Sequence, residues 1–172
     1  RCLPSTYKLS RQTKLHRNAI KARKYFGTIL DPSELERRIH AFPAISYRYA
    51  IAHNDLHGEN VRVTGQEAIL IDFLWADYGP LSADPASLEV SLVLKTKTVD
   101  GAEWEGLADS LFRLDALTRV PAPLPPEVKG APISDAIRFI RQIALPDALD
   151  PLEYPIAVVL QLIRKASYGH QD

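Results

Sequence analysis

The 172-residue sequence contains no methionine and only one cysteine, Cys2. A single cysteine excludes an internal disulfide and favours a reducing location, so we expect a cytoplasmic protein. No apolar run approaches the roughly 20 residues of a membrane-spanning helix, and no secretory signal opens the chain, so no membrane partner is expected. Basic and acidic residues number 21 each, so the net charge gives no sign of a nucleic-acid partner. The remaining composition, 46% hydrophobic and 24% charged, is ordinary for a globular domain.

Glycine is also scarce before residue 53, where Gly27 is the only one. The pattern in this part predicts helices, one over residues 5–26 and one from the capping sequence at 31–34 to about Phe42. The first helix carries a basic stripe on one face, formed by Lys8, Arg11, Lys14, Arg17, Lys21 and Lys24. Such a stripe is either a solvated face or a contact for phosphates or an acidic partner. Because aromatic residues are few beside it, a nucleic-acid partner is the weaker candidate.

The most informative stretch runs from His53 to Asn60 and is followed, after a short gap, by Ile71-Asp72-Phe73. It holds one aspartate, an asparagine five residues later, and a second aspartate at the end of an apolar run. Phosphoryl transfer needs metal ions that hold the phosphates and a group that activates the attacking hydroxyl. Carboxylate and amide oxygens in this order suit both tasks.

The residues between these two segments predict a small β-hairpin. Residues 61–63 alternate like a short strand, and residues 64–67 have the composition of a turn. Residues 68–71 form an unbroken apolar run, which predicts a buried strand. Because a hairpin brings its ends together, we expect the side chains of Asp55, Asn60 and Asp72 to meet on one rim.

The sequence His-x-Asp-Leu-His-x-x-Asn followed by Ile-Asp-Phe resembles the catalytic loop and metal-binding segment of aminoglycoside phosphotransferase and choline-kinase-like enzymes, which are relatives of the protein kinases. The resemblance is sharp over residues 50–94 and diffuse elsewhere. It implies ATP and Mg²⁺ as cofactors and a hydroxyl of a small molecule as the acceptor. In that family Asp72 matches the principal metal ligand, Asn60 the second metal ligand, and Asp55 the residue that accepts or orients the proton of the hydroxyl.

Three further positions of the loop have roles implied by the same resemblance. His53 would brace the loop by hydrogen bonding. His57 stands where protein kinases usually have lysine, which favours a small-molecule kinase. Asn54 stands where many protein kinases have arginine, so control by phosphorylation of an activation loop is not expected.

The resemblance also implies the fold class: α+β and mostly helical, equivalent to the C-terminal lobe of the protein-kinase-like fold over residues 1–172, with one small β-hairpin carrying the catalytic and metal-binding segments. Kinase-like enzymes place a Gly-rich loop and a strand lysine ahead of the catalytic loop. The 52 residues before His53 show neither, and the chain begins with Arg1. We therefore expect a fragment whose partner is a missing nucleotide-binding N-terminal lobe.

Downstream, the segment Asp84 to Glu89 resembles the Asp-Pro-x-x-Asp-Leu segment of the same family. Glu89 replaces the usual aspartate and is expected to brace the backbone of the catalytic loop. Asp77 and Asp84 add negative charge beside the site, which either attracts a cationic substrate or caps turns.

The rest of the chain predicts a loop and helices. Residues 74–80 are expected to be a loop, residues 120–132 a proline-rich connector, and Ser134 a helix cap. Residues 85–94 and 103–117 are expected to be helices, and so is the segment with Ala136, Ile137, Ile140, Ile143 and Ala144 on its inner side. A last helix follows the capping sequence 150–153 and ends near Tyr168, with Gly169 as its stop.

Three alternatives stay open at this level. A polar loop with capping aspartates and buried histidines would need no chemistry at all. A zinc or iron site formed by His53, Asp55 and His57 is possible, because alternate residues of a strand share a face. A non-catalytic, pseudokinase-like regulatory or scaffolding domain on the same fold would explain the missing lobe.

Overall fold

The computed structural model describes residues 37, 41, 45–95 and 101–168, and the helices predicted over 5–26 and 31–42 fall almost wholly outside them, as does Gly169. The chain divides into two units, Ser46–Gln161 and a second one of Arg1–Ile45 with Leu162–Asp172. The following helices and strands lie within the first unit, except that α7 continues past its end. The elements are β1 (Tyr49–Ala52), η2 (Gly58–Asn60), β2 (Val61–Thr64), β3 (Glu67–Leu70), η3 (Phe73–Trp75), β4 (Asp77–Pro80), α3 (Ala83–Lys95), α4 (Gly101–Phe112), α5 (Leu114–Leu117), α6 (Ala131–Asp147) and α7 (Glu153–Tyr168).

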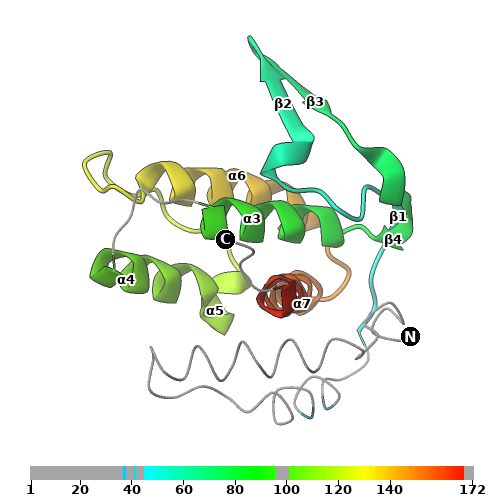
Figure 1. The fold of residues 1–172 in the computed structure, drawn as a ribbon. Helices are drawn as coiled ribbons and strands as arrows, with labels where there is room; N and C mark the ends of the chain where they lie inside the picture. Colours follow the sequence, from blue (N-terminus) through cyan, green and yellow to red (C-terminus); the bar gives the residue numbers. More distant parts are fainter. Residues whose placement is uncertain (1–36, 38–40, 42–44, 96–100, 169–172) are drawn as a thin grey trace. The chain divides into compact units, whose positions relative to one another are not determined.

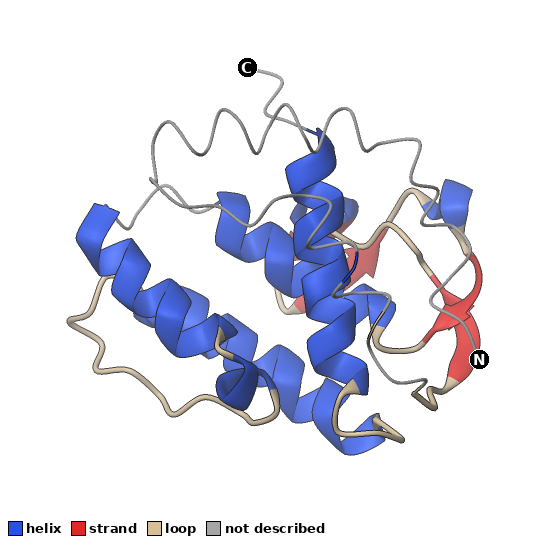
Figure 2. Cartoon of the chain, turned by 90° about the horizontal axis from the view of Figure 1, so that it is seen from below, coloured by secondary structure: helices blue, strands red, loops and turns tan. Residues whose placement is uncertain are grey.

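The described residues form an α+β structure that is mostly helical, as predicted, with short antiparallel strands (Figures 1 and 2). The predicted hairpin is present: β2 pairs with β3, with Val61 opposite Leu70 and Thr64 opposite Glu67. Gly65 turns the chain with a φ of 63°, which a glycine adopts without steric cost. The prediction that residues 68–71 form a buried strand is wrong. All of β3 is exposed, because the ribbon extends clear of the helices (Figure 1).

A second ribbon was not predicted. β1 pairs antiparallel with β4, so that Ile51 lies opposite Tyr78 and Ala52 opposite Asp77. The prediction of a loop over residues 74–80 is therefore wrong for its second half, since residues 77–80 form β4. The two strands lie 25 or more residues apart in the sequence, and no short-range pattern connects them. This second ribbon pairs the strand that precedes the catalytic loop, β1, with the strand that follows Asp72 and η3, β4.

Helix α3 begins two residues before the predicted start and places Pro85 in its first turn, where a missing N–H costs nothing. It packs against α6 and contacts η2. The hydrophobic core lies between α3, α4 and α6. Its buried members are Val93, Leu107, Leu111, Ile133 and Ile137, with Trp104, Phe112 and Leu124 packed against them.

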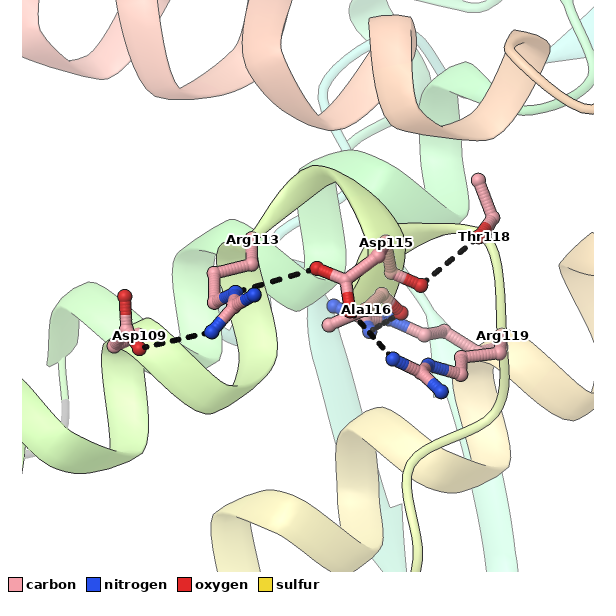
Figure 3. A network of polar contacts seen from close by, with 7 residues as sticks. Asp109, Arg113, Asp115, Ala116, Thr118 and Arg119 are labelled. Carbon is pink, nitrogen blue, oxygen red and sulfur yellow. Dashed lines mark hydrogen bonds and ion pairs between the residues drawn. The ribbon is translucent and has the colours of Figure 1, made fainter.

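The predicted helix 103–117 is broken in two at Arg113, whose φ of −62° and ψ of 146° are extended rather than helical. Figure 3 shows Arg113 between Asp109 and Asp115 at this junction. Asp115 also receives the guanidinium of Arg119 at 2.5 Å. Desolvation raises the pKa of Asp115, but the charges of Arg113 and Arg119 outweigh it and lower that pKa below its ordinary value. The cluster is exposed, so it shapes the junction more than it stabilises the fold.

Helix α6 begins at Ala131 with Gly130 at its N-cap, so the prediction of Ser134 as the cap is wrong. Ser134 is buried inside the first turn and donates its main-chain N–H to the Gly130 carbonyl at 3.0 Å. The prediction that Ile143 faces inward is also wrong, since this side chain is 71% exposed.

Helix α7 confirms the capping sequence predicted at 150–153. The carboxylate of Asp150 accepts the N–H of Leu152 at 2.8 Å, and Glu153 reaches back to the N–H of Leu149 at 2.9 Å. The helix ends at Tyr168, as predicted. None of the helices within the described ranges combines the length and apolar character that a membrane crossing requires.

Candidate active site

The catalytic loop is tied to the metal-binding segment through the main chain of Ile71, the residue before Asp72. The Nε2 atom of His53 lies 2.8 Å from the Ile71 carbonyl oxygen. Because a carbonyl only accepts, Nε2 must carry the proton. The Ile71 N–H in turn donates to the Asn60 carbonyl at 3.0 Å. His53 thus makes the loop-supporting hydrogen bond expected of it, and both ends of the 53–60 loop are joined to the start of the Asp72 segment.

Asn60 is buried at the end of η2 and binds back across the loop. Its Nδ2 donates to the main-chain carbonyl of Asp55 at 3.1 Å. This bond orients the amide, so that its Oδ1 is the oxygen left for a ligand. It also fixes Asn60 relative to Asp55, the residue expected to receive the proton of the acceptor.

The backbone of the catalytic loop is held by Asp84, which lies in the first turn of α3. One carboxylate oxygen of Asp84 accepts the N–H of His53 at 2.6 Å, and the other accepts the N–H of Asn54 at 2.9 Å. Both oxygens are therefore engaged in bracing the loop rather than in capping a turn. The prediction that Glu89 performs this task is wrong: Glu89 is fully buried and paired with Arg141 of α6.

A second attachment from α3 lies about two turns further along. The hydroxyl oxygen of Ser91 accepts the N–H of Gly58 at 3.0 Å. Gly58 opens η2, the short turn that carries Asn60. Asp84 and Ser91 lie seven residues apart, hence on one face of α3, and together they hold the two ends of the catalytic loop.

Asp55 faces His57 within the loop. The Nε2 atom of His57 lies 3.7 Å from Oδ2 of Asp55, and Nδ1 lies 4.0 Å from Glu59. The Asp55 side chain keeps 24% of its surface exposed. A partly exposed carboxylate is the kind of group that accepts a proton from a hydroxyl.

Asp72 is exposed and has a φ of 63°, in the left-handed region that most side chains avoid. Aspartate is one of the few residues that adopt it readily. This backbone conformation at Asp72 turns the chain from the residues after β3 into η3, of which Asp72 is the N-cap. Asp77 is likewise exposed, and its carboxylate accepts the N–H of the next residue, Tyr78, at 2.7 Å.

The donor set fits Mg²⁺ better than zinc or iron. Mg²⁺ takes one or two protein oxygens together with phosphates and waters, and Asn60 and Asp72 offer one amide and one carboxylate. The alternative of a site formed by His53, Asp55 and His57 is not supported. No group of three such ligands comes together anywhere in the described part of the chain.

Sequence reasoning missed three contributors: the bracing carboxylate of Asp84, the hydroxyl of Ser91, and the amide of Asn54, which donates to the carbonyls of Trp75 and Asp77. In the sequence, Asp84 is marked only by its place in a motif and by its charge. Its spacing of seven from Ser91 on a predicted helix was the one available signal of a shared face. The loop partners of Asp84 and Ser91 lie 30 or more residues away, at positions that no local pattern indicates.

Residues 4–114, more than half of the 172 residues, match the Phosphotransferase enzyme family. No curated protein and no solved structure matches the chain. The match covers the catalytic loop, the Asp72 segment and helix α3, whose mutual contacts are given above. The chain therefore belongs to the Phosphotransferase enzyme family.

Proposed function

We propose that this chain provides the metal-binding and proton-accepting residues of an enzyme that transfers the γ-phosphoryl group of ATP to a hydroxyl of a small molecule. The observation that carries the proposal is the set of bonds around Ile71 and Asn60. Two of these bonds, of 2.8 and 3.0 Å, join the loop of Asp55 to Ile71, the residue before Asp72. A third, of 3.1 Å, ties Asn60 to Asp55 within the loop. Phosphoryl transfer consists mainly of positioning and charge neutralisation, and this framework serves positioning.

Asn60 and Asp72 would hold Mg²⁺, which would supply neutralisation of the charge on the phosphate oxygens. Asp55 accepts the proton of the acceptor hydroxyl as the oxygen attacks, and such a group contributes about 10²–10⁴ in rate. His57, 3.7 Å from Asp55, would modulate the charge of that carboxylate. A proposed N-terminal lobe would cover the nucleotide. The proposed location is the cytoplasm, which would supply ATP and the reducing conditions that suit Cys2.

A cationic acceptor is the substrate class that the charges favour. Asp84 is occupied by the loop, so Asp77 is the carboxylate left exposed on the segment after Asp72. Asp55, Glu59 and Asp72 add further negative charge nearby in sequence, which a cationic small molecule would complement.

The test measures the thermal shift that ATP and Mg²⁺ cause in the full-length protein, with its proposed N-terminal lobe, and this shift follows RT ln(1 + [L]/Kd). We expect a shift in the wild type that disappears in Asp72→Ala and persists in Asp55→Ala, because Asp55 does not bind the metal. Asp109→Ala, an exposed acid on α4, is the matched control. A wild-type chain that shows no shift at saturating ATP and Mg²⁺, or a shift that survives Asp72→Ala, would contradict the proposal and favour a non-catalytic domain.

A further inference from the structure

The side chain of Asn54 connects the catalytic loop to the segment that follows Asp72. Its Nδ2 donates to the main-chain carbonyl of Asp77 at 3.0 Å and to that of Trp75 at 3.2 Å. A third carbonyl, that of Ala52, lies at 3.4 Å. An amide nitrogen has two hydrogens, so the two shorter contacts account for its donor capacity. Both of their acceptors lie within five residues of Asp72.

The backbone of Asn54 is held as firmly as its side chain. Its N–H donates to Asp84 at 2.9 Å, and its φ of 62° lies in the left-handed region. Asparagine combines tolerance of this region with a two-hydrogen donor group. Alanine and the β-branched residues would be strained there, and aspartate or glycine would keep the backbone but lose the donor.

Strand β4 makes room for this side chain. A Cβ atom on Gly79 would lie 2.6 Å from the Oδ1 atom of Asn54, which is shorter than any real contact of such an atom. Any other residue at position 79 would therefore displace the amide. Gly79 is thus required by Asn54, although its own φ is not positive.

We propose that Asn54 is a positioning residue, which sets the placement of Asp55 relative to Asp72 by clamping residues 75–77 onto the catalytic loop. The inference rests on the proposed function, in which those two carboxylates act on opposite ends of one transfer. Asn54 directly precedes Asp55, so the clamp acts on the Asp55 carboxylate through a single peptide unit. It acts on the Asp72 carboxylate through η3, which directly follows Asp72. A misplacement of about 1 Å in such a site costs on the order of 10² in rate.

The test uses Asn54→Gly and Asn54→Asp in the full chain, since both residues tolerate the left-handed backbone. Hydrogen exchange over residues 73–80 is measured without any ligand, and the apparent Mg²⁺ affinity is measured from the thermal shift at fixed ATP. We expect faster exchange in both variants and a Mg²⁺ affinity lowered by about 10–100-fold, the usual effect of losing support for a metal ligand. Unchanged exchange overturns the clamp. Faster exchange with unchanged Mg²⁺ affinity overturns the positioning role.

A double-mutant cycle with Gly79→Ala gives a second, independent test. Gly79→Ala should reproduce the loss of Mg²⁺ affinity, because its methyl group displaces the amide. In the Asn54→Gly background the same change should add little, since the group it displaces is gone. Gly106→Ala, where a Cβ meets nothing within 4 Å, is the control and should change neither readout. Additive losses would overturn the proposal. A wild-type chain without any ATP–Mg²⁺ shift would instead refute the proposed function, while the exchange data would still decide whether the clamp exists.

Discussion

Arg141 of α6 and Glu89 of α3 form a bidentate ion pair in which both side chains are fully buried, with nitrogen–oxygen distances of 2.6 and 3.1 Å. Arg141 also donates to the carbonyls of Leu111 and Ala116, at the ends of α4 and α5. The hydroxyl of Tyr154 on α7 donates to Glu89 at 2.6 Å. This cluster fixes the position of α3, the helix that braces the catalytic loop through Asp84 and Ser91.

Arg141→Met should destabilise the protein by about 3–5 kcal/mol, because it leaves the Glu89 charge buried without a partner. The double variant Arg141→Met with Glu89→Leu should lose less than the single change, since no charge then remains in the core. The measurement is urea unfolding of each variant. Arg138→Met on the same helix removes a partly exposed pair with Asp135 and should cost about 1 kcal/mol or less. Equal losses for Arg141→Met and Arg138→Met would refute the prediction.

Tyr154→Phe should change how stability depends on pH above about 10, the ordinary pKa of tyrosine. Burial and the adjacent Glu89 carboxylate raise the pKa of Tyr154 far above that value. The unfolded chain therefore releases the phenol proton near pH 10 while the folded chain retains it, so the wild type loses stability as the pH rises further. Tyr154→Phe removes this contribution and flattens the slope.

Unfolding free energies between pH 8 and pH 11 measure the effect of Tyr154→Phe. At pH 8 the variant should be less stable by about 1.5–3 kcal/mol, because a hydrogen bond to a charged group is lost. Tyr49→Phe, which removes an exposed hydroxyl, is the control. Parallel curves for Tyr154→Phe and the wild type would show that the buried phenol is not the cause of the alkaline loss.

Asp84→Asn should loosen the catalytic loop, because an amide offers one acceptor oxygen where the carboxylate offers two. One of the N–H groups of His53 and Asn54 then faces an NH₂ group, at a cost of about 1–3 kcal/mol. Amide exchange at these two positions and urea unfolding are the measurements. Asp77→Asn, whose carboxylate is exposed, should leave the loop amides unchanged. Normal protection at positions 53 and 54 in Asp84→Asn would contradict the bracing role.

Ser91→Ala and Ser87→Ala form a matched pair on α3, since both hydroxyls are buried and one turn apart. Ser91→Ala leaves the Gly58 N–H without its acceptor and should cost about 1–3 kcal/mol. The Ser87 hydroxyl has no hydrogen-bond partner among the described residues, so Ser87→Ala should be neutral or slightly stabilising. Thermal unfolding separates the two outcomes, and a larger loss for Ser87→Ala would reverse the interpretation.

The sequence alone determined the features that depend on near neighbours. The β2–β3 hairpin follows from a turn between two short runs, and Gly65 supplies the required backbone. The start of α7 follows from a capping carboxylate and a glutamate that reaches back four residues. The order of Asp55, Asn60 and Asp72 indicated the family, because it resembles the catalytic loop and metal-binding segment of that family.

Only the tertiary structure decided the contacts between distant residues. Whether Asp84 or Glu89 braces the catalytic loop depends on how α3 is rotated, and Arg141, 52 residues away, holds Glu89 on the opposite side. The pairing of β1 with β4 and the reach of Asn54 to the carbonyl of Asp77 likewise join segments with no common local pattern. The physical reason is that a buried polar group is satisfied by whichever partner the packing brings near, and spacing along the chain carries no record of that choice.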